Sequence, residues 1–397
     1  MRDLASVKVT GHSIRLPFLP LGILLLVVFV LGAIMLTHIY MNTDYLFHVQ
    51  AAEVIAQGVE VDFPHRLYHW FTIGLHSLLP GTNFYVAGIG VSLVAYMLLA
   101  SVVMVSFHRQ MRGRRPWLAV ALTLGLMLTA PILILNLQGS GLYFSYLHPF
   151  TYHNPTSTLM RPLALIVFLH VAYAFVPPVA AWGQIALAAF VSLLLSNAKP
   201  NYSLTLLPVA GLGMVYRLGR RLFVDLKMLV AILGVITLFL ALQYLTTFNT
   251  GGASTGLGIE PFALLQERGF SLPIILIKHA LSIVFPVAIL VLYWPSARRD
   301  PLLMLAWACF ALGAFYALAV VELGTRRTDN NFYWSGEITL FLLFFASLHF
   351  WLRHMGGRFD LSQRRAQIAM VIWGLHIVSG LYWYVAQILT TPVYNAW

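Results

Sequence analysis

The sequence predicts an all-α polytopic membrane protein that forms a single integral membrane domain over residues 1–397. Hydrophobic residues make up 60% of the chain and charged residues 9%, whereas about 25% of an ordinary soluble domain is charged. Apolar runs also recur from one end of the chain to the other, with no long polar segment between them. Lipid, not water, is therefore expected to surround most of the molecule.

Apolar runs of about 20 residues are long enough to cross a bilayer as helices. By this criterion we expect about eleven spans, within a range of about 9 to 13, at residues 18–37, 84–107, 117–137, 161–177, 179–196, 203–216, 228–247, 273–293, 302–321, 337–352 and 366–389. The three in the middle are short, and Pro177, Pro178 and Pro200 mark their joints because proline ends or kinks a helix. The first run follows basic residues as a signal peptide does, but its length predicts a retained anchor helix.

Charge orients these spans, because lysine and arginine collect in cytoplasmic loops. With the N-terminus inside, 17 of the 24 basic residues fall on the cytoplasmic side and nine of the 13 acidic residues fall outside. The inner loops are short and plain, whereas the outer segments combine carboxylates, histidines, asparagines and aromatics. Function is therefore expected at the outer face, in the first outer loop, 38–82, and in the loops 138–160, 248–272 and 322–336.

The same composition excludes two kinds of site. The net charge of +11 does not indicate a nucleic-acid partner, because the basic residues form short clusters between apolar spans, as orientation signals do. Cys309 is the one cysteine and lies within an apolar run, so the chain has no disulfide framework and no cysteine-rich metal site. Membrane lipids are the expected partners, and nucleic acid is not.

The first outer loop contains the stretch TDYLFHVQAAEVIAQG, residues 43–58. Thr43 can cap a helix whose first turn holds Asp44, where a negative charge suits the helix dipole. His48 lies four residues further on and shares the face of Asp44. One interpretation is a capped helix lying along the membrane surface. The other is a catalytic site in which Asp44 is a general base that His48 tunes or orients.

The loop continues with FPHRLYHWFTIGLHSLLPG, residues 63–81, whose aromatics and leucines predict one or two amphipathic helices at the interface. His65, His69 and His76 are spaced to share one face. Two histidines four residues apart can bind zinc, but a third ligand and the glutamate of an HExxH motif are missing. No cofactor is therefore assigned. We interpret His65 and His69 as facing a wet cleft that binds substrate, and a bound divalent metal is the lesser alternative.

Two further outer segments combine imidazoles and amides with cations, and these donors suit a phosphate or sugar hydroxyls. For the loop 138–162, the alternative to substrate binding is ordinary helix capping within an aromatic belt. For Lys199, between two short spans, the alternative is a side chain that reaches outward to water. The candidate substrate-binding residues here are His153, Asn154, Arg161, Lys199 and Asn201.

The last polar outer segment, 322–337, places two adjacent arginines on the side where basic residues are disfavoured. They could clasp a phosphate or pyrophosphate, or pair internally with Asp329 and Glu322. The glycine-rich segment 249–269 follows no strand, so we interpret it as a flexible outer loop that could act as a lid. The candidate substrate-binding residues of the 322–337 segment are Arg326, Arg327, Asn330 and Glu337.

This layout resembles that of the GT-C superfamily of membrane glycosyltransferases. Shared features are an N-terminus inside, a first outer loop that begins with aspartate and contains interfacial helices, and many spans joined by polar outer loops. The stretch DYLFHVQAAEVIAQG looks like the first-loop acidic region of bacterial members. The chain departs from the metal-dependent and oligosaccharyl-transferring members, because its first loop lacks a DxD-like or paired-acid motif and no soluble C-terminal domain is expected.

The resemblance implies a function on the outer face of a bacterial inner membrane. The donor would be a sugar linked to polyprenyl phosphate, the acceptor a glycan or lipid, and the reaction a hexosyl or pentosyl transfer. Asp44 would be the catalytic carboxylate, and the outer arginines would contact the lipid phosphate.

Two other functions fit the same outer residues. A transporter or flippase of lipid-linked saccharides could use the cations for binding, and polar residues inside the spans would favour it. Few are present, chiefly His170, Gln243 and His376. An O-antigen-type polymerase or ligase would rely on the outer arginines and a histidine instead of Asp44.

The orientation makes the first testable prediction. Reporter fusions after Arg115, Arg221 and Arg299 are expected to report the cytoplasm, and fusions after Gln57 and Thr328 the outer side, because of the uneven distribution of basic residues. Two or more reversed reporters would overturn the topology.

Overall fold

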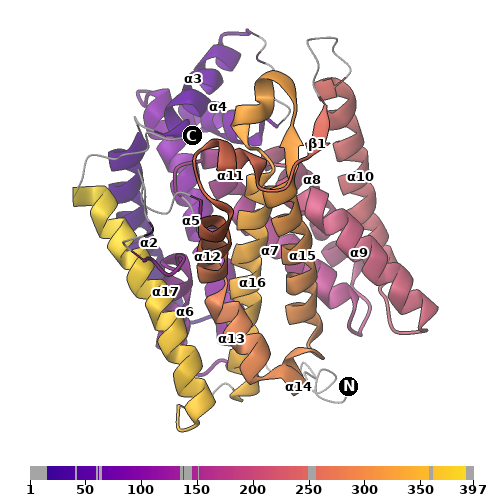
Figure 1. Ribbon diagram of the computed structural model, residues 1–397. Coiled ribbons are helices and arrows are strands. Elements are labelled where there is room, and N and C mark those ends of the chain that lie inside the picture. The colour runs from indigo at the N-terminus through magenta and orange to yellow at the C-terminus, as the bar shows by residue number, and fades with distance from the viewer. Residues whose placement is uncertain are drawn as a thin grey trace.

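A computed structural model describes residues 16–40, 43–59, 61, 65–134, 137, 145–150, 152–248, 256–356 and 361–389. Over these residues the chain forms a bundle of long helices (Figure 1). The elements are α2 (Phe18–Ile39), α3 (Asp44–Ala56), α4 (Leu67–Leu78), α5 (Phe84–Gln110), α6 (Pro116–Met127), α7 (Pro155–Ala174), α8 (Trp182–Ala198), α9 (Asn201–Gly219), α10 (Leu226–Phe248), β1 (Leu257–Ile259), α11 (Ala263–Glu267), α12 (Leu272–Ser282), α13 (Val284–Leu292), α14 (Trp294–Ala297), α15 (Pro301–Ala319), β2 (Val320–Glu322), η3 (Gly324–Asp329), α16 (Tyr333–His354) and α17 (Arg364–Leu389).

Among the described residues, seven helices are long and apolar enough to cross a membrane, and the bent pair α12 and α13 makes eight if it counts as one span. Helices α6 and α8 are apolar but shorter. The predicted class, a helical polytopic membrane protein, is confirmed. Each expected span except 117–137 coincides with a helix or a bent pair of helices, while the number that cross the membrane stays a prediction.

Segments expected on opposite sides of the membrane lie at opposite ends of the bundle. In Figure 1, α3, α4, β1 and α11 are gathered at the upper end, whereas α14 and the start of α17 are at the lower end. The two helices expected in the first outer loop, α3 and α4, are present between α2 and α5. We call the end that carries α3 and α4 the outer end.

The expected span 117–137 is a helix only in its first half. Helix α6 ends at Met127, because Pro131 cannot donate the hydrogen bond that would continue it. The irregular chain that follows packs on α17, where the Ala130 N–H donates to the His376 carbonyl (3.2 Å) and the Ala130 carbonyl bonds His376 Nδ1 (2.6 Å). Backbone groups freed by the helix break therefore find partners within the bundle.

The expected span 273–293 is also broken. Helices α12 and α13 meet at Ile283 at an angle of 61°, and Pro286 in the first turn of α13 has no N–H to bridge the break. The Phe285 N–H donates instead to His376 Nε2 (3.3 Å). Because Nε2 accepts, Nδ1 of His376 carries the hydrogen that the Ala130 carbonyl receives, so one imidazole supports both helix breaks.

A short antiparallel ladder joins two outer segments. Its strand β1 lies in the segment 249–269 that we expected to be a flexible loop, and Leu257 pairs with Glu322 and Ile259 with Val320 of β2. Residues 249–255 lie outside the described residues. Strands of three residues carry no periodic sequence signal, which is why the pairing was not expected.

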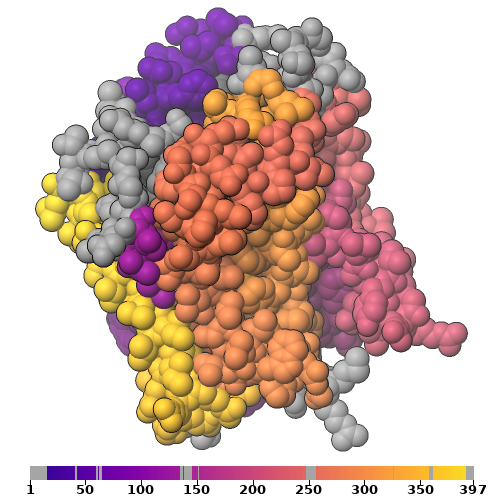
Figure 2. Space-filling model, viewed as in Figure 1, coloured from indigo at the N-terminus to yellow at the C-terminus, as the bar shows by residue number. Residues whose placement is uncertain are grey.

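Helix α16 forms the centre of the bundle, with every residue from Tyr333 to Leu352 buried. The segment from β1 to α14 covers the front of the molecule in the space-filling view (Figure 2). Glycine and serine let α15 and α16 approach closely, since a Cβ added to Gly313 would collide with Thr339 and Ser335. The first turn of α16 is therefore held firmly at the outer end, where the candidate site lies.

Candidate functional site

Asp44 stands at the first position of α3, as expected. Thr43 is the N-cap, and its hydroxyl accepts from the Tyr45 N–H at 3.5 Å. The Asp44 carboxylate accepts a hydrogen bond from Asn154 Nδ2 at 2.6 Å. The helix start therefore aims the carboxylate at α7, which is 110 residues away in the sequence.

Asn154 is fixed because it caps α7. Its Oδ1 accepts from the Ser157 N–H (2.9 Å) and from the Thr156 hydroxyl (2.7 Å). Pro155 follows at the first helical position, where its missing N–H costs nothing. The start of α7 is thus at 155, six residues before the expected start of the span at Arg161, and the Asn-Pro pair is the sequence signal that could have located it.

Lys199 lies at the joint between α8 and α9 and is 4% exposed. Its Nζ donates to Asn154 Oδ1 (3.3 Å) and Thr156 Oγ1 (3.4 Å), and it lies 3.9 Å from the centre of the Trp334 ring. One carboxamide, that of Asn154, therefore contacts the Lys199 ammonium through its oxygen and the Asp44 carboxylate through its nitrogen. We call Asp44, Asn154, Thr156, Lys199 and Trp334 the bridged cluster.

A second pair of opposite charges lies beside this cluster. Arg161 on α7 is 2% exposed, and its guanidinium lies 4.9 Å from the centre of the Phe150 ring. Glu337 on α16 is also buried and interacts electrostatically with both Arg161 and Lys199. Two cations and two carboxylates are thus gathered in this part of the outer end, where each buried charge has an opposite charge that acts on it.

Burial sets the proton affinities in the bridged cluster. It raises the pKa of Asp44, against the opposing effects of the Asn154 hydrogen bond and the Lys199 charge. It also lowers the pKa of Lys199 to about 7, although Asp44 and Glu337 act to raise it. Both groups therefore titrate closer to neutrality than their ordinary values, which is the tuning that acid–base chemistry uses.

The histidines expected in the first outer loop are placed differently. His48 Nδ1 lies 3.1 Å from His69 Nε2, so one ring donates to the other. Burial lowers the pKa of His48 well below its ordinary value and that of His69 to about 4, which keeps the pair neutral. His48 was expected to orient Asp44, but the structure shows it hydrogen-bonded to His69. In the part of the chain described, Asn154 is the one hydrogen-bond partner of Asp44.

The expected shared face of three histidines is wrong, because α4 begins only at Leu67. His65 precedes the helix, and His76 stacks on Phe84 at 4.1 Å between ring centres. Burial and the nearby charges of Lys199 and Arg326 lower the pKa of His65 to about 3. Within the described residues, no group of three histidine, cysteine or acidic side chains is arranged to hold a metal ion.

His153 also joins the site. Its ring lies 5.2 Å from the Trp334 ring, centre to centre, and burial lowers its pKa to about 3, assisted by the charges of Lys199 and Arg161. The Trp334 ring thus has both an imidazole and an ammonium close to it. Trp334 and Thr156 were not predicted as site residues, because an aromatic and a threonine in an outer loop carry no distinctive pattern.

Asn201 links the Lys199 joint to the start of α16. Its Nδ2 donates to the Asn331 carbonyl (2.7 Å) and to Ser335 Oγ (3.2 Å). The side chain of Asn331 in turn donates to Glu322 Oε2 at 2.6 Å. This chain of hydrogen bonds joins α9, α16 and β2, so Asn201 acts in the structure as a connector.

The two adjacent arginines have different partners. Arg326 lies 3.4 Å from Glu322 and 3.7 Å from Asp329, the internal pairing that was one of the two expected arrangements. Both distances exceed those of a well-formed charged hydrogen bond. The charges of Arg326 and Lys199 both act on His65. Arg326 is therefore held loosely, and it shares one electrostatic neighbour with the bridged cluster.

Arg327 is held tightly by carboxylates of the β1–α11 segment. It forms two hydrogen bonds to Glu260, Nη2 to Oε2 at 2.6 Å and Nη1 to Oε1 at 3.2 Å, and it also pairs with Glu267. Arg327 lowers the pKa of Glu260. We call these three residues the arginine clasp, and it joins η3 to the segment that carries β1.

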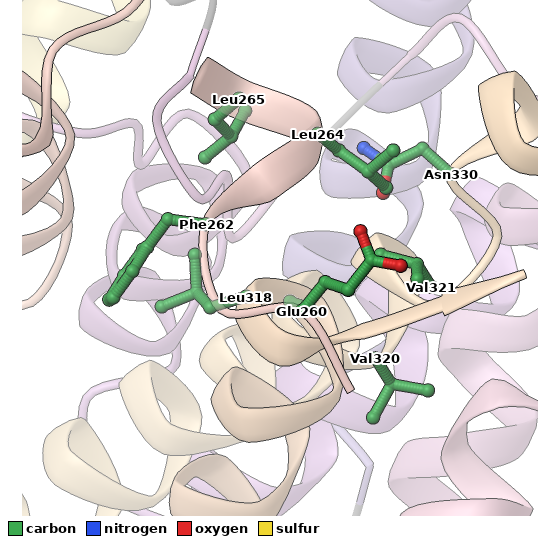
Figure 3. A pocket seen from close by; sticks show the side chains of 9 residues that line it. Glu260, Phe262, Leu264, Leu265, Leu318, Val320, Val321 and Asn330 are labelled. Carbon is green, nitrogen blue, oxygen red and sulfur yellow. The ribbon is translucent and has the colours of Figure 1, made fainter. Parts of the chain in front are cut away.

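A pocket lies beside the arginine clasp (Figure 3). Most of its lining is apolar, and Glu260 and Asn330 supply its polar groups. The Glu260 carboxylate already occupies Arg327, so this arginine is not left to bind an anionic substrate in the pocket. Such a substrate would also meet the negative charge of Glu260. The pocket residues are Glu260, Phe262, Leu264, Leu265, Ala317, Leu318, Val320, Val321 and Asn330.

Neither models of known protein families nor curated proteins match this sequence. The chemistry of the site therefore rests on its residues. The bridged cluster combines a half-buried carboxylate, a buried amine and an aromatic ring at the outer end of a membrane protein, which suits proton transfer next to an anionic substrate.

The lowered pKa of Lys199 predicts a pH-dependent stability. Lysine ordinarily titrates near 10.5, and Lys199 titrates near 7 in the folded protein. Between these values the unfolded chain binds more protons, so the stability contributed by this group rises with pH from about 7 to 10.5. In nanodiscs, the melting temperature of wild type relative to Lys199→Met should rise across this window. The exposed Lys227→Met serves as control, and parallel melting curves for wild type and Lys199→Met would contradict the burial of this amine.

Proposed function

We propose that this protein is a membrane glycosyltransferase that moves a hexosyl or pentosyl group from a polyprenyl-phosphate donor to a hydroxyl group of a glycan or lipid acceptor. The observation that carries the proposal is the bridged cluster, in which one amide connects a carboxylate to a buried amine. The resemblance in layout to the GT-C superfamily supports the same reaction. Transfer would take place at the outer face of the membrane.

Asp44 is the general base in this proposal. Its Oδ2 is bonded to Asn154, and no other hydrogen bond to the carboxylate occurs among the described residues, so Oδ1 can receive a proton from the acceptor hydroxyl. A carboxylate with a raised pKa is a stronger base than an ordinary one. A divalent metal remains the lesser alternative, because no three-ligand group is present in the described residues.

The transfer step needs one proton acceptor and one stabilised leaving group. The acceptor oxygen loses its proton to Asp44 and forms a bond to the anomeric carbon. The bond between that carbon and the phosphate oxygen breaks, and its electron pair stays on the departing polyprenyl phosphate. Lys199, and Arg326 at the edge of the cluster, stabilise the charge that develops there.

The two adjacent arginines divide their roles. Arg326 has loose ion pairs, and its charge and that of Lys199 both act on His65, so it can turn part of its guanidinium to a phosphate. Arg327 already gives its donors to Glu260 and Glu267 and acts as a structural fastener. Arg161, enclosed by aromatic rings with Glu337 nearby, stabilises the site without reaching the substrate.

The polar residues inside the spans give the transporter alternative little support. His170 bonds the Ile166 carbonyl, Gln243 bonds the Ser196 carbonyl, and His376 bonds backbone at two helix breaks. These side chains satisfy local backbone groups and do not form a polar path. The polymerase or ligase alternative needs a free arginine and a basic histidine, whereas burial lowers the pKa of both His69 and His153.

Asp44→Asn tests the catalytic base. The amide keeps the size of the side chain and the helix start but cannot take a proton, and loss of a general base typically lowers the rate by about 10²- to 10⁴-fold. We expect a folded protein whose sugar transfer falls at least a hundredfold, measured in proteoliposomes with a panel of decaprenyl-phosphate hexoses and pentoses. The matched control is Glu53→Gln, an exposed carboxylate on the same helix.

Transfer at the wild-type rate by Asp44→Asn would refute the role of Asp44 as base. Movement of the lipid-linked sugar across sealed vesicles without any transfer would favour the transporter.

The phosphate contact predicts that Lys199→Met and Arg326→Gln bind a polyprenyl phosphate more weakly, while Arg327→Gln does not. Loss of one charge-assisted contact costs about 1.5–3 kcal/mol, or roughly 10- to 150-fold in affinity. Binding to protein in nanodiscs can be measured with a fluorescent polyprenyl phosphate. Equal weakening by all three substitutions would show that the two arginines are not separated in function.

A further inference from the structure

The Asn154 carboxamide can adopt only one orientation in its surroundings. Its oxygen faces the Ser157 N–H at 2.9 Å, the Thr156 hydroxyl at 2.7 Å and the Lys199 amine at 3.3 Å. The backbone N–H can only donate, and an ammonium can only donate. A flipped amide would direct its own N–H groups at the Ser157 N–H and the Lys199 ammonium and lose both of these bonds, although the Thr156 hydroxyl could still accept. The oxygen is therefore fixed toward α7 and Lys199.

This orientation directs the amide nitrogen at Asp44. Nδ2 donates to Oδ2 at 2.6 Å, a short distance typical of a hydrogen bond to a charged acceptor. Asn154 is 4% exposed, so water does not compete strongly for this bond. One carboxylate oxygen is thus held by the scaffold, and no hydrogen bond to the other is found among the described residues.

We propose that Asn154 is a positioning residue that fixes the rotamer of Asp44 and leaves Oδ1 as the atom that accepts the proton. Sequence analysis placed Asn154 among residues that contact substrate; the contacts instead assign it to the carboxylate. The catalytic consequence of this inference rests on the proposed function, whereas the hydrogen bond between Asn154 and Asp44 is independent of it.

Few charged groups compete with Asn154 for control of Asp44. Among the residues that the structure describes, Lys199, from the joint between α8 and α9, is the one charge found to act on the carboxylate. On α3 itself, His48 faces His69 of α4, and Tyr45 lies among groups of α5 and α7. Loss of the Asn154 donor is therefore expected to raise the pKa of Asp44, because that bond favours the charged form.

Two substitutions remove the donor and keep the helix cap. Asn154→Ser and Asn154→Asp both retain a side-chain oxygen suited to an N-cap, and Asn154→Asp also adds a like charge beside Asp44. The matched control is Asn83→Ser, because Asn83 caps α5 in the same way through Val86 at 2.8 Å. Cap effects alone would then appear equally in the control.

The first readout is the titration of Asp44 itself. Infrared difference spectra of the protein in nanodiscs give a carboxylic acid band, and the part of it that Asp44→Asn removes belongs to Asp44. We expect its midpoint to rise by about one to two pKa units in Asn154→Ser and further in Asn154→Asp. The rise should persist when Lys199→Met is added. An unchanged midpoint, or an equal change in Asn83→Ser, would overturn the inference.

The second readout is the pH dependence of transfer. If Asp44 is the base, the acidic limb of kcat/KM should move upward with the same midpoint in Asn154→Ser, whereas a merely structural role would lower the rate at every pH equally. An Asp44 midpoint that rises while Asp44→Asn still transfers sugar would refute the proposed function and leave the positioning contact standing. An acidic limb that does not move, in a protein where Asp44→Asn is inactive, would refute the positioning role alone.

Discussion

Charges buried in a helical bundle within lipid must find partners inside the protein, because the surrounding medium cannot solvate them. At the outer end this requirement is met by one neutral side chain. The Asn154 amide contacts the Lys199 amine on one side and the Asp44 carboxylate on the other. Its own orientation follows from the N-cap of α7, so the start of a membrane helix decides which oxygen of Asp44 is bonded and, in the proposed reaction, which one accepts the proton. Arg161 and Glu337 complete the charge balance beside it.

At the same end of the protein, the residues proposed to contact substrate are distinct from those that fasten neighbouring segments together. The arginine clasp and the β1–β2 ladder join segments that are more than 50 residues apart in the sequence, and the hydrogen bonds of Asn201 and Asn331 extend this framework to the Lys199 joint. Exposed ion pairs of this kind contribute little stability individually. Their value is geometric, because they fix η3 and the first turn of α16 against the bridged cluster while Arg326 keeps looser contacts.

Local patterns in the sequence predicted the helices, the Thr43 cap and the place of Asp44 in the first turn of α3, because these depend on residues within one or two turns. Contacts between distant segments were not predictable: nothing in either segment signals that Asn154 meets Asp44 or that Arg327 meets Glu260. The helix breaks near residues 128 and 283 were also missed: Pro131 and Pro286 were local signals within apolar runs of spanning length, but the tertiary hydrogen bonds of His376 that support the breaks have no local signal. The Asn-Pro start of α7 was a local signal that we did not use.

The central claim is that the bridged cluster is where the lipid phosphate and the proton acceptor meet. A cryo-electron microscopy structure of the protein in nanodiscs with a non-reactive polyprenyl phosphonate sugar tests this most directly. We predict the phosphonate within hydrogen-bonding distance of Lys199 Nζ and the anomeric carbon facing Oδ1 of Asp44. A phosphonate bound at the Glu260 pocket or between other helices, with Asp44 away from the sugar, would contradict the account.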